Sequence, residues 1–464
     1  MTERDPSSRQ ESALFSLDPS AAPVGDSCRP TRRQWVRLVA QGAAWPAASA
    51  LLGAASPAAS GAEPTNEPSG AAGATQAAAM QHVVRDFRDP YLELLRLLHV
   101  AAEIEHGLMI QYLYGAFSVK PIYQGLAGYG APHANDLMGI AIQEMQHLGK
   151  VNQLLVALGA APTLIREDFP YEPEINPFRL RLEPLSRASL AKYVWCESPP
   201  GATDMRQARN AADRAFCGDL EAALGPARRP NFVGDLYSTI INLTKELGAT
   251  QDRAVPDLHP WVKLLQDIKD EGEVGHYPCF RRAFLGSHEG FAGQTDVWSR
   301  SVSDPLYPAY PLPTDPTAYL GHENQILDPA AQRLAWLGNL HYWSVLSLLS
   351  VGYSIGSPEL VALSRGHMMG PFFSLARKLA QLGSGMPFDP LGQGYLHGLK
   401  NGGSVRFVRR LLLEADHLEK QIGKALPSDF PADFCRATTA ALARLEPSVR
   451  SARAPTEPWN DGLA

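Results

Sequence analysis

The chain has 464 residues, enough for two or three domain-sized units or for one large helical protein with a continuous core. Its formal net charge is only −6, with acidic and basic residues nearly balanced. This balance gives no electrostatic reason to expect nucleic acid or an anionic membrane surface as a partner, so both classes are set aside.

Residues 1–60 are predicted to be a twin-arginine export signal. Arg32 and Arg33 follow a polar start, a weakly apolar run occupies residues 38–55, and small residues near Ser60 suit a cleavage site. Polar residues, glycine and proline interrupt the apolar run, so stable membrane insertion is not expected. The alternative is a disordered, alanine-rich tail. The export interpretation makes the twin-arginine machinery a partner and the mature protein periplasmic or secreted.

Residues 61–84 are rich in alanine, glycine, proline and threonine, which predicts a flexible linker. Removal of the signal would also remove Cys28 and leave four cysteines: Cys196, Cys217, Cys279 and Cys435. Their spacing is not a zinc pattern. In an oxidising compartment they could form up to two disulfides, and buried thiols are an equal alternative.

A four-helix bundle is predicted over residues 85–290. Asp89 is a suitable N-cap and Pro90 a suitable first helical residue for a helix that runs to about Phe117. A second helix covers residues 140–158 and is closed by Gly159. A mixed helical run over 185–196 follows, and two further long helical patterns cover 231–247 and 260–284.

Residues 291–325 are rich in proline and tyrosine and predict an irregular connection. Residues 326–464 form a C-terminal helical region with helices expected over 332–349, 357–382, 404–426 and 428–445. No convincing set of alternating strands is present. The predicted fold class is therefore all-α.

Glu144 and His147 lie in the middle of the apolar face of the second helix, beside Ile140, Leu148 and Val151. A carboxylate and an imidazole that face a core are costly unless something pairs with them, and one metal ion satisfies both. An inward Glu-x-x-His pair is the ligand unit of carboxylate-bridged di-iron and di-manganese bundles.

The first helix offers Glu103 and Glu105 as a further ligand. Glu105 shares its face with Leu98, Leu108 and other apolar residues, whereas the neighbours of Glu103 are polar. Glu105 is therefore the candidate. The alternatives for an inward acid are a buried ion pair and a hydrogen bond to a tyrosine. Tyr112 is close in sequence, and core packing is its expected role.

The second half repeats the arrangement. Glu273 and His276 form another Glu-x-x-His, and Asp235 precedes Glu273 by nearly the interval that separates Glu105 from Glu144. Two similar helical hairpins would place ligands at such matched intervals. Glu246 and Glu271 are rival acids in this half, and a solvated position for Asp235 is an open alternative.

Two glycines flank Glu273, Gly272 and Gly275, and they indicate a helix that is kinked or widened there. Elsewhere, His341 and His367 lie in apolar or Met-rich helices. They are expected to be satisfied core groups, with a haem ligand as the alternative.

The sequence resembles the ferritin-like domain of the iminophenyl-pyruvate dimer synthases. Five stretches carry the likeness: Ala101–Lys120, Ile140–Leu164, Val233–Ile240, Asp270–Phe284 and His367–Gly385. The resemblance implies a ferritin-like bundle and these metal ligands: Glu105, Glu144, His147, Asp235, Glu273 and His276. Asp235 stands where a glutamate is more usual in the family.

The expected cofactor is dinuclear iron, with manganese as an alternative, bridged by Glu144 and Glu273. The expected function is an O₂-dependent oxidase or oxygenase for a small organic substrate. Family members join amino-acid-derived imines during indole-alkaloid assembly, a pathway that an exported protein would not meet, so no substrate is assigned. The alternatives are an iron-binding or ferroxidase-type protein and a non-catalytic scaffold.

Overall fold

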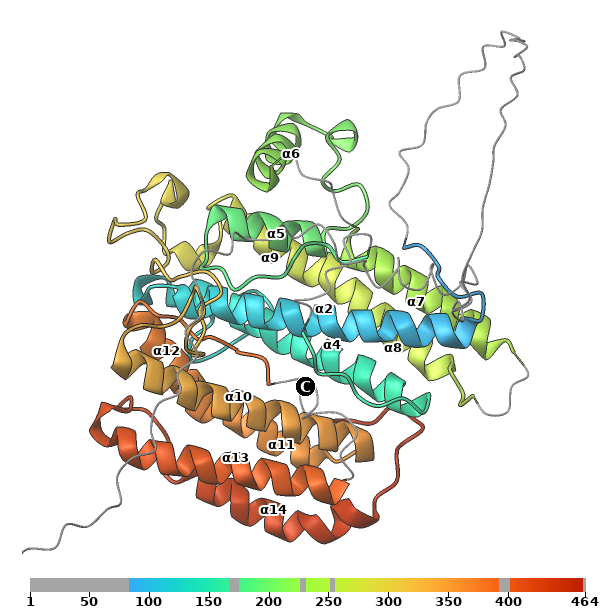
Figure 1. Cartoon of the computed structure of the whole chain (residues 1–464). Helices are drawn as coiled ribbons and strands as arrows, with labels where there is room; N and C mark the ends of the chain where they lie inside the picture. The colour runs from blue at the N-terminus through green and yellow to red at the C-terminus, as the bar shows by residue number, and fades with distance from the viewer. Residues whose placement is uncertain (1–82, 167–174, 226–230, 251–254, 392–400, 462–464) are drawn as a thin grey trace, which may run out of the picture. The chain divides into compact units, whose positions relative to one another are not determined.

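The computed structural model describes residues 83–166, 175–225, 231–250, 255–391 and 401–461. The predicted export signal lies outside these residues, as does almost all of the predicted linker. Within the described ranges the regular secondary structure is helical, apart from two isolated β-bridges (Figure 1). The all-α prediction is confirmed.

The first bundle is built on two long helices, α2 (Pro90–Ser118) and α4 (Leu137–Ala157), which pack against each other. The helix opposite them is continuous from α8 (His259–Asp270) through a π-helical segment (Glu271–His276) into α9 (Tyr277–Phe284). The widened helix expected around Gly272 and Gly275 is therefore present.

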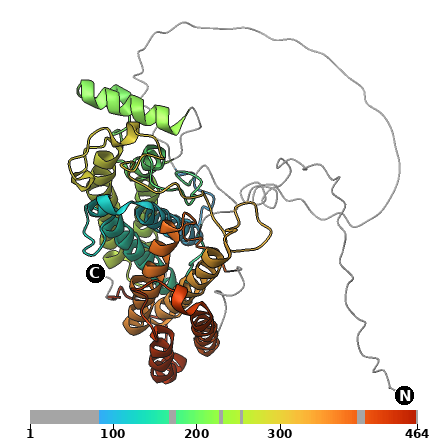
Figure 2. The ribbon, with the colours of Figure 1, turned by 90° about the vertical axis from the view of Figure 1, so that its left-hand side faces the viewer.

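Two shorter helices share the remaining position of this bundle. Helix α5 (Arg187–Glu197) packs along α9, and α7 (Val233–Gly248) packs along α8 and α2. They follow one another along the α8–α9 helix (Figure 1). Between them lies α6 (Ala211–Leu224), which packs on α5 away from the core of the bundle (Figure 2). The sequence did not predict α6.

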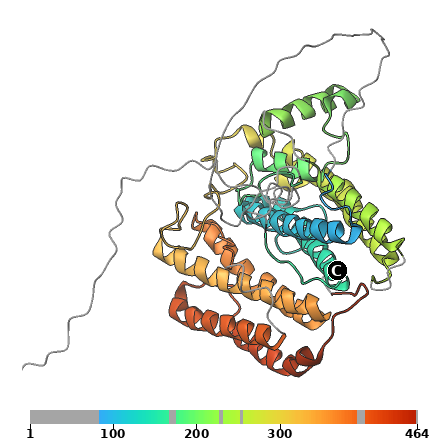
Figure 3. The ribbon, with the colours of Figure 1, turned by 45° about the vertical axis from the view of Figure 1, so that its right-hand side comes forward.

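The C-terminal region is centred on α10 (Pro329–Ile355). It contacts α4 on one side and three helices of its own region on the other: α11 (Pro358–His367), α12 (Phe373–Gln381) and α13 (Asn401–Ile422). A second π-helical segment, Met368–Phe372, joins α11 to α12, and α14 (Phe434–Ser451) packs on α13 (Figure 3). All four predicted C-terminal helical stretches contain helices.

The irregular connection lies against the end of α2. Backbone hydrogen bonds join Lys120 to Pro308 and Tyr310 to Ser118, and the Tyr114 hydroxyl donates to the Pro313 carbonyl. The bond from the Tyr310 N–H satisfies the Ser118 carbonyl, which the helix end leaves without a partner, and the other two satisfy carbonyl groups of the connection itself. The connection thus closes one end of the bundle before α10 begins.

All four cysteines after Cys28 are buried, and none is in a disulfide. Of the two alternatives left open by the sequence, the structure shows buried thiols. Among the helices in the described ranges, none has both the length and the apolar character that crossing a membrane requires.

The start of α4 depends on Asp136. Its carboxylate is buried and accepts hydrogen bonds from the backbone N–H groups of Gly139 (2.7 Å) and His133 (2.9 Å). Asp89 caps α2 in the same manner through Leu92 N, but at an exposed position.

We expect Asp136→Ala to lower the free energy of unfolding by about 1–3 kcal/mol, because it removes a cap and leaves a buried N–H without a partner. Asp89→Ala, the matched control, should cost about 1 kcal/mol or less because water can replace an exposed cap. Chemical denaturation measures both. An Asp136→Ala cost no larger than that of Asp89→Ala would contradict this account.

Candidate metal centre

Five buried side chains from four elements meet inside the first bundle. Helix α2 provides Glu105, α4 provides Glu144 and His147, the last residue of α5 is Glu197, and the π-helical segment provides His276. Each is no more than 5% exposed. They form two potential metal-binding groups that share Glu144: one with Glu105 and His147, the other with Glu197 and His276.

Glu144 joins the two groups because each of its oxygens faces a different imidazole. Its Oε2 lies 2.9 Å from His147 Nδ1, and its Oε1 lies 2.9 Å from His276 Nδ1. The two rings are stacked, with centroids 5.7 Å apart. A carboxylate with one oxygen toward each of two nitrogen ligands has the arrangement of a bridge between two metal ions.

Each outer acid is held by a tyrosine. The Tyr237 hydroxyl of α7 donates to Glu105 Oε1, and the Tyr112 hydroxyl of α2 donates to Glu197 Oε1 at 2.6 Å. The second oxygen of Glu105 lies 3.6 Å from His147 Nδ1, too far for a hydrogen bond. Partners of this kind orient metal-binding carboxylates. Tyr112 therefore does more than the core packing that the sequence predicted.

A second set of contacts fixes the imidazoles. His147 Nε2 lies 2.9 Å from Glu271 Oε2, and His276 Nε2 lies 3.2 Å from the amide oxygen of Gln143. The Gln143 amide nitrogen donates to Glu271. Glu271 and Gln143 thereby link α4 to the π-helical segment at the edge of the site.

Burial and the charges of neighbouring groups give the three acids different pKa values. Burial, then the charge of Glu144, raise the pKa of Glu105 to about 8, and the same causes raise the pKa of Glu197. Burial acts on Glu144 in the same direction, but His276 and His147 outweigh it and hold its pKa well below the usual range.

The imidazoles show the complementary effect. Burial opposes the protonation of His276, but the Glu144 carboxylate outweighs it and raises the pKa to about 10. The pKa of His147 is raised well above its ordinary value in spite of burial, because the neighbouring carboxylates of Glu105, Glu144 and Glu271 favour its protonated form. The cluster thus requires positive charge at two positions beside Glu144.

The free space in this cluster is small. Its cavity has a volume of about 20 Å³ and is lined by the acids, His147, Tyr237 and the backbone of Gly234 and Gly272. This volume accommodates a water molecule or an ion, but not an organic molecule.

The structure brings together four of the six predicted ligands: Glu105, Glu144, His147 and His276. It does not bring Asp235 or Glu273 into either group. Asp235 is only partly buried, and Glu273 lies at the cavity edge with Oε1 2.8 Å from Lys269 Nζ. The predicted bridge between metals by Glu273 is therefore not present in this arrangement.

The local backbone explains both differences. Hydrogen bonds in a π-helix join residues five positions apart, so the turn is wider and residues three apart, such as Glu273 and His276, no longer share one face. On α7 the inward residue is Tyr237, and a residue two positions away points to the other side of an α-helix. Asp235 is in that position.

Glu197 was missed because the predicted helical run ended at Cys196. In the structure α5 includes Glu197, and Leu190, Tyr193, Val194 and Glu197 form a buried stripe at helical spacing. An acid that ends an apolar stripe is the same signal that identified Glu105. This signal is present in the sequence, but Pro199 and Pro200 placed the expected end of the helix at Cys196, one residue too early.

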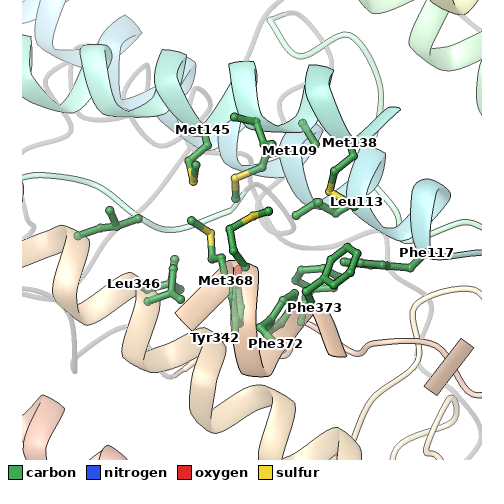
Figure 4. Close-up of a pocket in the computed structure, with 16 residues that line it drawn as sticks. Met109, Leu113, Phe117, Met138, Met145, Tyr342, Leu346, Met368, Phe372 and Phe373 are labelled. Carbon is green, nitrogen blue, oxygen red and sulfur yellow. The ribbon is translucent and has the colours of Figure 1, made fainter. Parts of the chain in front are cut away.

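A second, apolar cavity of about 50 Å³ lies between the helix pair α2 and α4 and the C-terminal region. Figure 4 shows Met109 and Met145 facing Met368 and Phe372 across it. Five of the nine methionines of the chain line this cavity. Methionine side chains adapt readily to apolar ligands. Met145 follows Glu144 on α4, and successive residues of an α-helix are about 100° apart, so the cavity and the cluster lie on different faces of this helix.

Residues 98–280 match the family described as Ferritin-like, and this range contains every residue of the cluster. The predicted resemblance is thereby confirmed for this part of the chain. The ferritin-like domain is followed by the C-terminal helical region, which lies outside the matched range.

Among curated proteins, the dichlorochromopyrrolate synthase of Lentzea aerocolonigenes is 25% identical to this chain over 336 residues. The match covers 60% of this chain and 32% of that synthase, so the chain spans about a third of the length of the relative. No solved structure matches the chain significantly.

The close approach of Gly272 to Glu197 gives a test of this geometry. A Cβ atom on Gly272 would lie 2.7 Å from Glu197 Oε2, whereas a Cβ on Gly275 would meet only Glu271 Cγ at 3.9 Å. Both glycines belong to the π-helical segment.

We expect Gly272→Ala to displace the Glu197 carboxylate and to weaken metal binding by about tenfold or more, the usual effect of disturbing a ligand. Gly275→Ala should bind metal as the wild type does. Metal titration of the two purified variants, with circular dichroism to verify folding, makes the comparison. Equal metal binding by the two variants would show that the Glu197 position is not required.

Proposed function

We propose that this protein is a metal-dependent, ferritin-like oxidase or oxygenase with a dinuclear iron centre, acting on a small organic substrate. The observation that carries the proposal is the position of Glu144, whose two oxygens face two different histidines in a buried site. One buried carboxylate between two imidazoles, with one further acid beside each, supplies a ligand set for two cations.

The proposed ligands of one ion are Glu105, Glu144 and His147, and those of the other are Glu144, Glu197 and His276. Glu197 thus takes the place that the sequence gave to Asp235. Carboxylates with imidazoles suit iron, and manganese is the alternative metal. Cys196 borders the cavity, but its thiol belongs to neither of the two candidate ligand groups.

The residues of the chain would hold and shield these metals. Tyr237 and Tyr112 orient the outer acids by donating hydrogen bonds, and Glu271 and Gln143 fix the imidazole rings. Burial of all five ligands excludes bulk water. Iron bound there would supply the electron-transfer chemistry that reactions with O₂ require.

An organic substrate is favoured by the relative, whose name describes the synthesis of a small molecule. The C-terminal helical region also supports it, since storage of iron needs only a four-helix bundle. A ferroxidase-type protein is the second candidate, because the two metal groups alone would suffice for it. A scaffold without metal is the third.

We expect the purified wild type to contain about two metal ions per chain, and His147→Ala and His276→Ala to lose roughly half each. Elemental analysis measures the metal content. His99→Ala on α2 is the control, since His99 forms its hydrogen bond with the Leu95 carbonyl within its own helix and belongs to neither ligand group. An absence of iron and manganese from the wild type, or unchanged metal in both variants, would reject the site.

Oxygen consumption separates the two metal-dependent functions. Uptake that requires an added organic compound supports the oxidase, whereas uptake on addition of ferrous iron alone supports the ferroxidase.

The twin-arginine export of the protein is part of the same proposal. That route carries folded proteins, which agrees with metal insertion before secretion. We expect Arg32→Lys/Arg33→Lys to abolish export and leave the unprocessed chain inside the cell. Cell fractionation with detection of the chain measures this, and Arg37→Lys serves as the control. Normal export of the double variant would overturn this part.

A further inference from the structure

Four helices of the C-terminal region place a second group of metal-binding side chains together. His341 comes from α10, His367 ends α11, Glu419 lies on α13 and Cys435 on α14. All four are buried, with exposures of 0%, 0%, 7% and 1%. The sequence treated the two histidines as separate core residues, but the fold brings them into contact.

The distances between these groups suit a small tetrahedral ion. Glu419 Oε1 lies 3.5 Å from His341 Nε2 and 3.1 Å from Cys435 Sγ, and the three donor atoms all lie within 4.8 Å of one another. Zinc bonds of about 2.0–2.3 Å give tetrahedral edges of roughly 3.3–3.5 Å. An ion could therefore enter with only small movements of the side chains.

His367 is placed to orient the His341 ring through the nitrogen that faces away from Glu419 and Cys435. Its Nδ1 lies 3.0 Å from His341 Nδ1, so Nε2 of His341 is the nitrogen directed at Glu419 and Cys435. Such a second partner on the far nitrogen is the usual support of a metal-binding histidine. The rings of Phe430 and Phe434 pack on the two imidazoles and hold the pair in position.

Hydrogen bonds alone do not satisfy the buried polar atoms of this cluster. Within the described part of the chain, Glu419 is contacted only by a thiol, a weak donor, and by the His341 nitrogen at 3.5 Å. The Nε2 atoms of both histidines are buried and make no hydrogen bond there. A buried carboxylate with such weak compensation is costly, and a cation removes the cost.

We propose that His341, Glu419 and Cys435 bind one zinc ion, with a water molecule as the fourth ligand. Thiolate, imidazole and carboxylate together are a zinc donor set, whereas the cluster in the ferritin-like domain contains no thiolate among its ligands. The three ligands come from α10, α13 and α14, so the ion ties the outermost helix pair to the helix that contacts the ferritin-like domain. This site is independent of the proposed oxidase function.

Zinc content tests the proposal in the full-length protein. To remove the contribution of the first cluster, the background carries His147→Ala and His276→Ala, and circular dichroism verifies that this background protein is folded. After dialysis against zinc, we expect about one tightly held zinc per chain. Adding Cys435→Ser should reduce it at least tenfold, whereas Cys217→Ser, a buried cysteine on α6, should leave it unchanged. Equal zinc in the two variants, or none in the background protein, would overturn the proposal.

Cobalt provides a second measurement that does not depend on folding of the Cys435 variant. Co²⁺ bound to the otherwise unaltered chain should show thiolate-to-cobalt charge-transfer absorption that persists in Cys196→Ser. Cys196 is the control because it borders the other cluster. Absence of this absorption, or its loss in Cys196→Ser, would show that Cys435 does not bind the metal. The proposal would then be overturned, and the group would be only a hydrogen-bonded cluster.

Discussion

The first bundle depends on the two contacts of Glu144, a hydrogen bond with His147 and an ion pair with His276. This carboxylate is buried and ionised, and it draws His147 from its own helix and His276 from the opposite helix toward one point. Charge that is buried in this manner is strongly destabilising if one partner is removed. The contacts therefore join α4 to the π-helical segment. The carboxylates of Glu105 and Glu197 lie on either side of this junction, one in each group.

The bundle position that α5 and α7 share is divided, and the break between these two helices falls at the cluster around Glu144. Glu197 ends α5, and Val233 begins α7 beside the same cavity. A helix end places a side chain with less constraint than a helix interior does, and Tyr112 supplies the missing constraint by its hydrogen bond to Glu197. The widened turn in the opposite helix faces this break, with Gly272 leaving room for the carboxylate.

The sequence predicted the half of the site that ordinary α-helices build. Glu105, Glu144 and His147 occupy regular positions on apolar faces, so helical periodicity finds them. In the other half the sequence predicted only His276, because the remaining positions lie where the periodicity fails: the π-helical turn rotates Glu273 away from His276, and the pair of prolines after Glu197 concealed the end of α5. Likewise, helix positions were predictable for the C-terminal region, but periodicity carries no information on the contact between His341 and His367.

The break between α5 and α7 also determines what borders the cavity beside the cluster. The chain leaves the core after Glu197, forms α6 on the outside and returns at Val233, so both ends of this excursion lie at the metal cavity. On this side the cavity is therefore bordered by the ends of two helices and not by one continuous helix, so the side chains at these two ends, Glu197 and Val233, shape its wall.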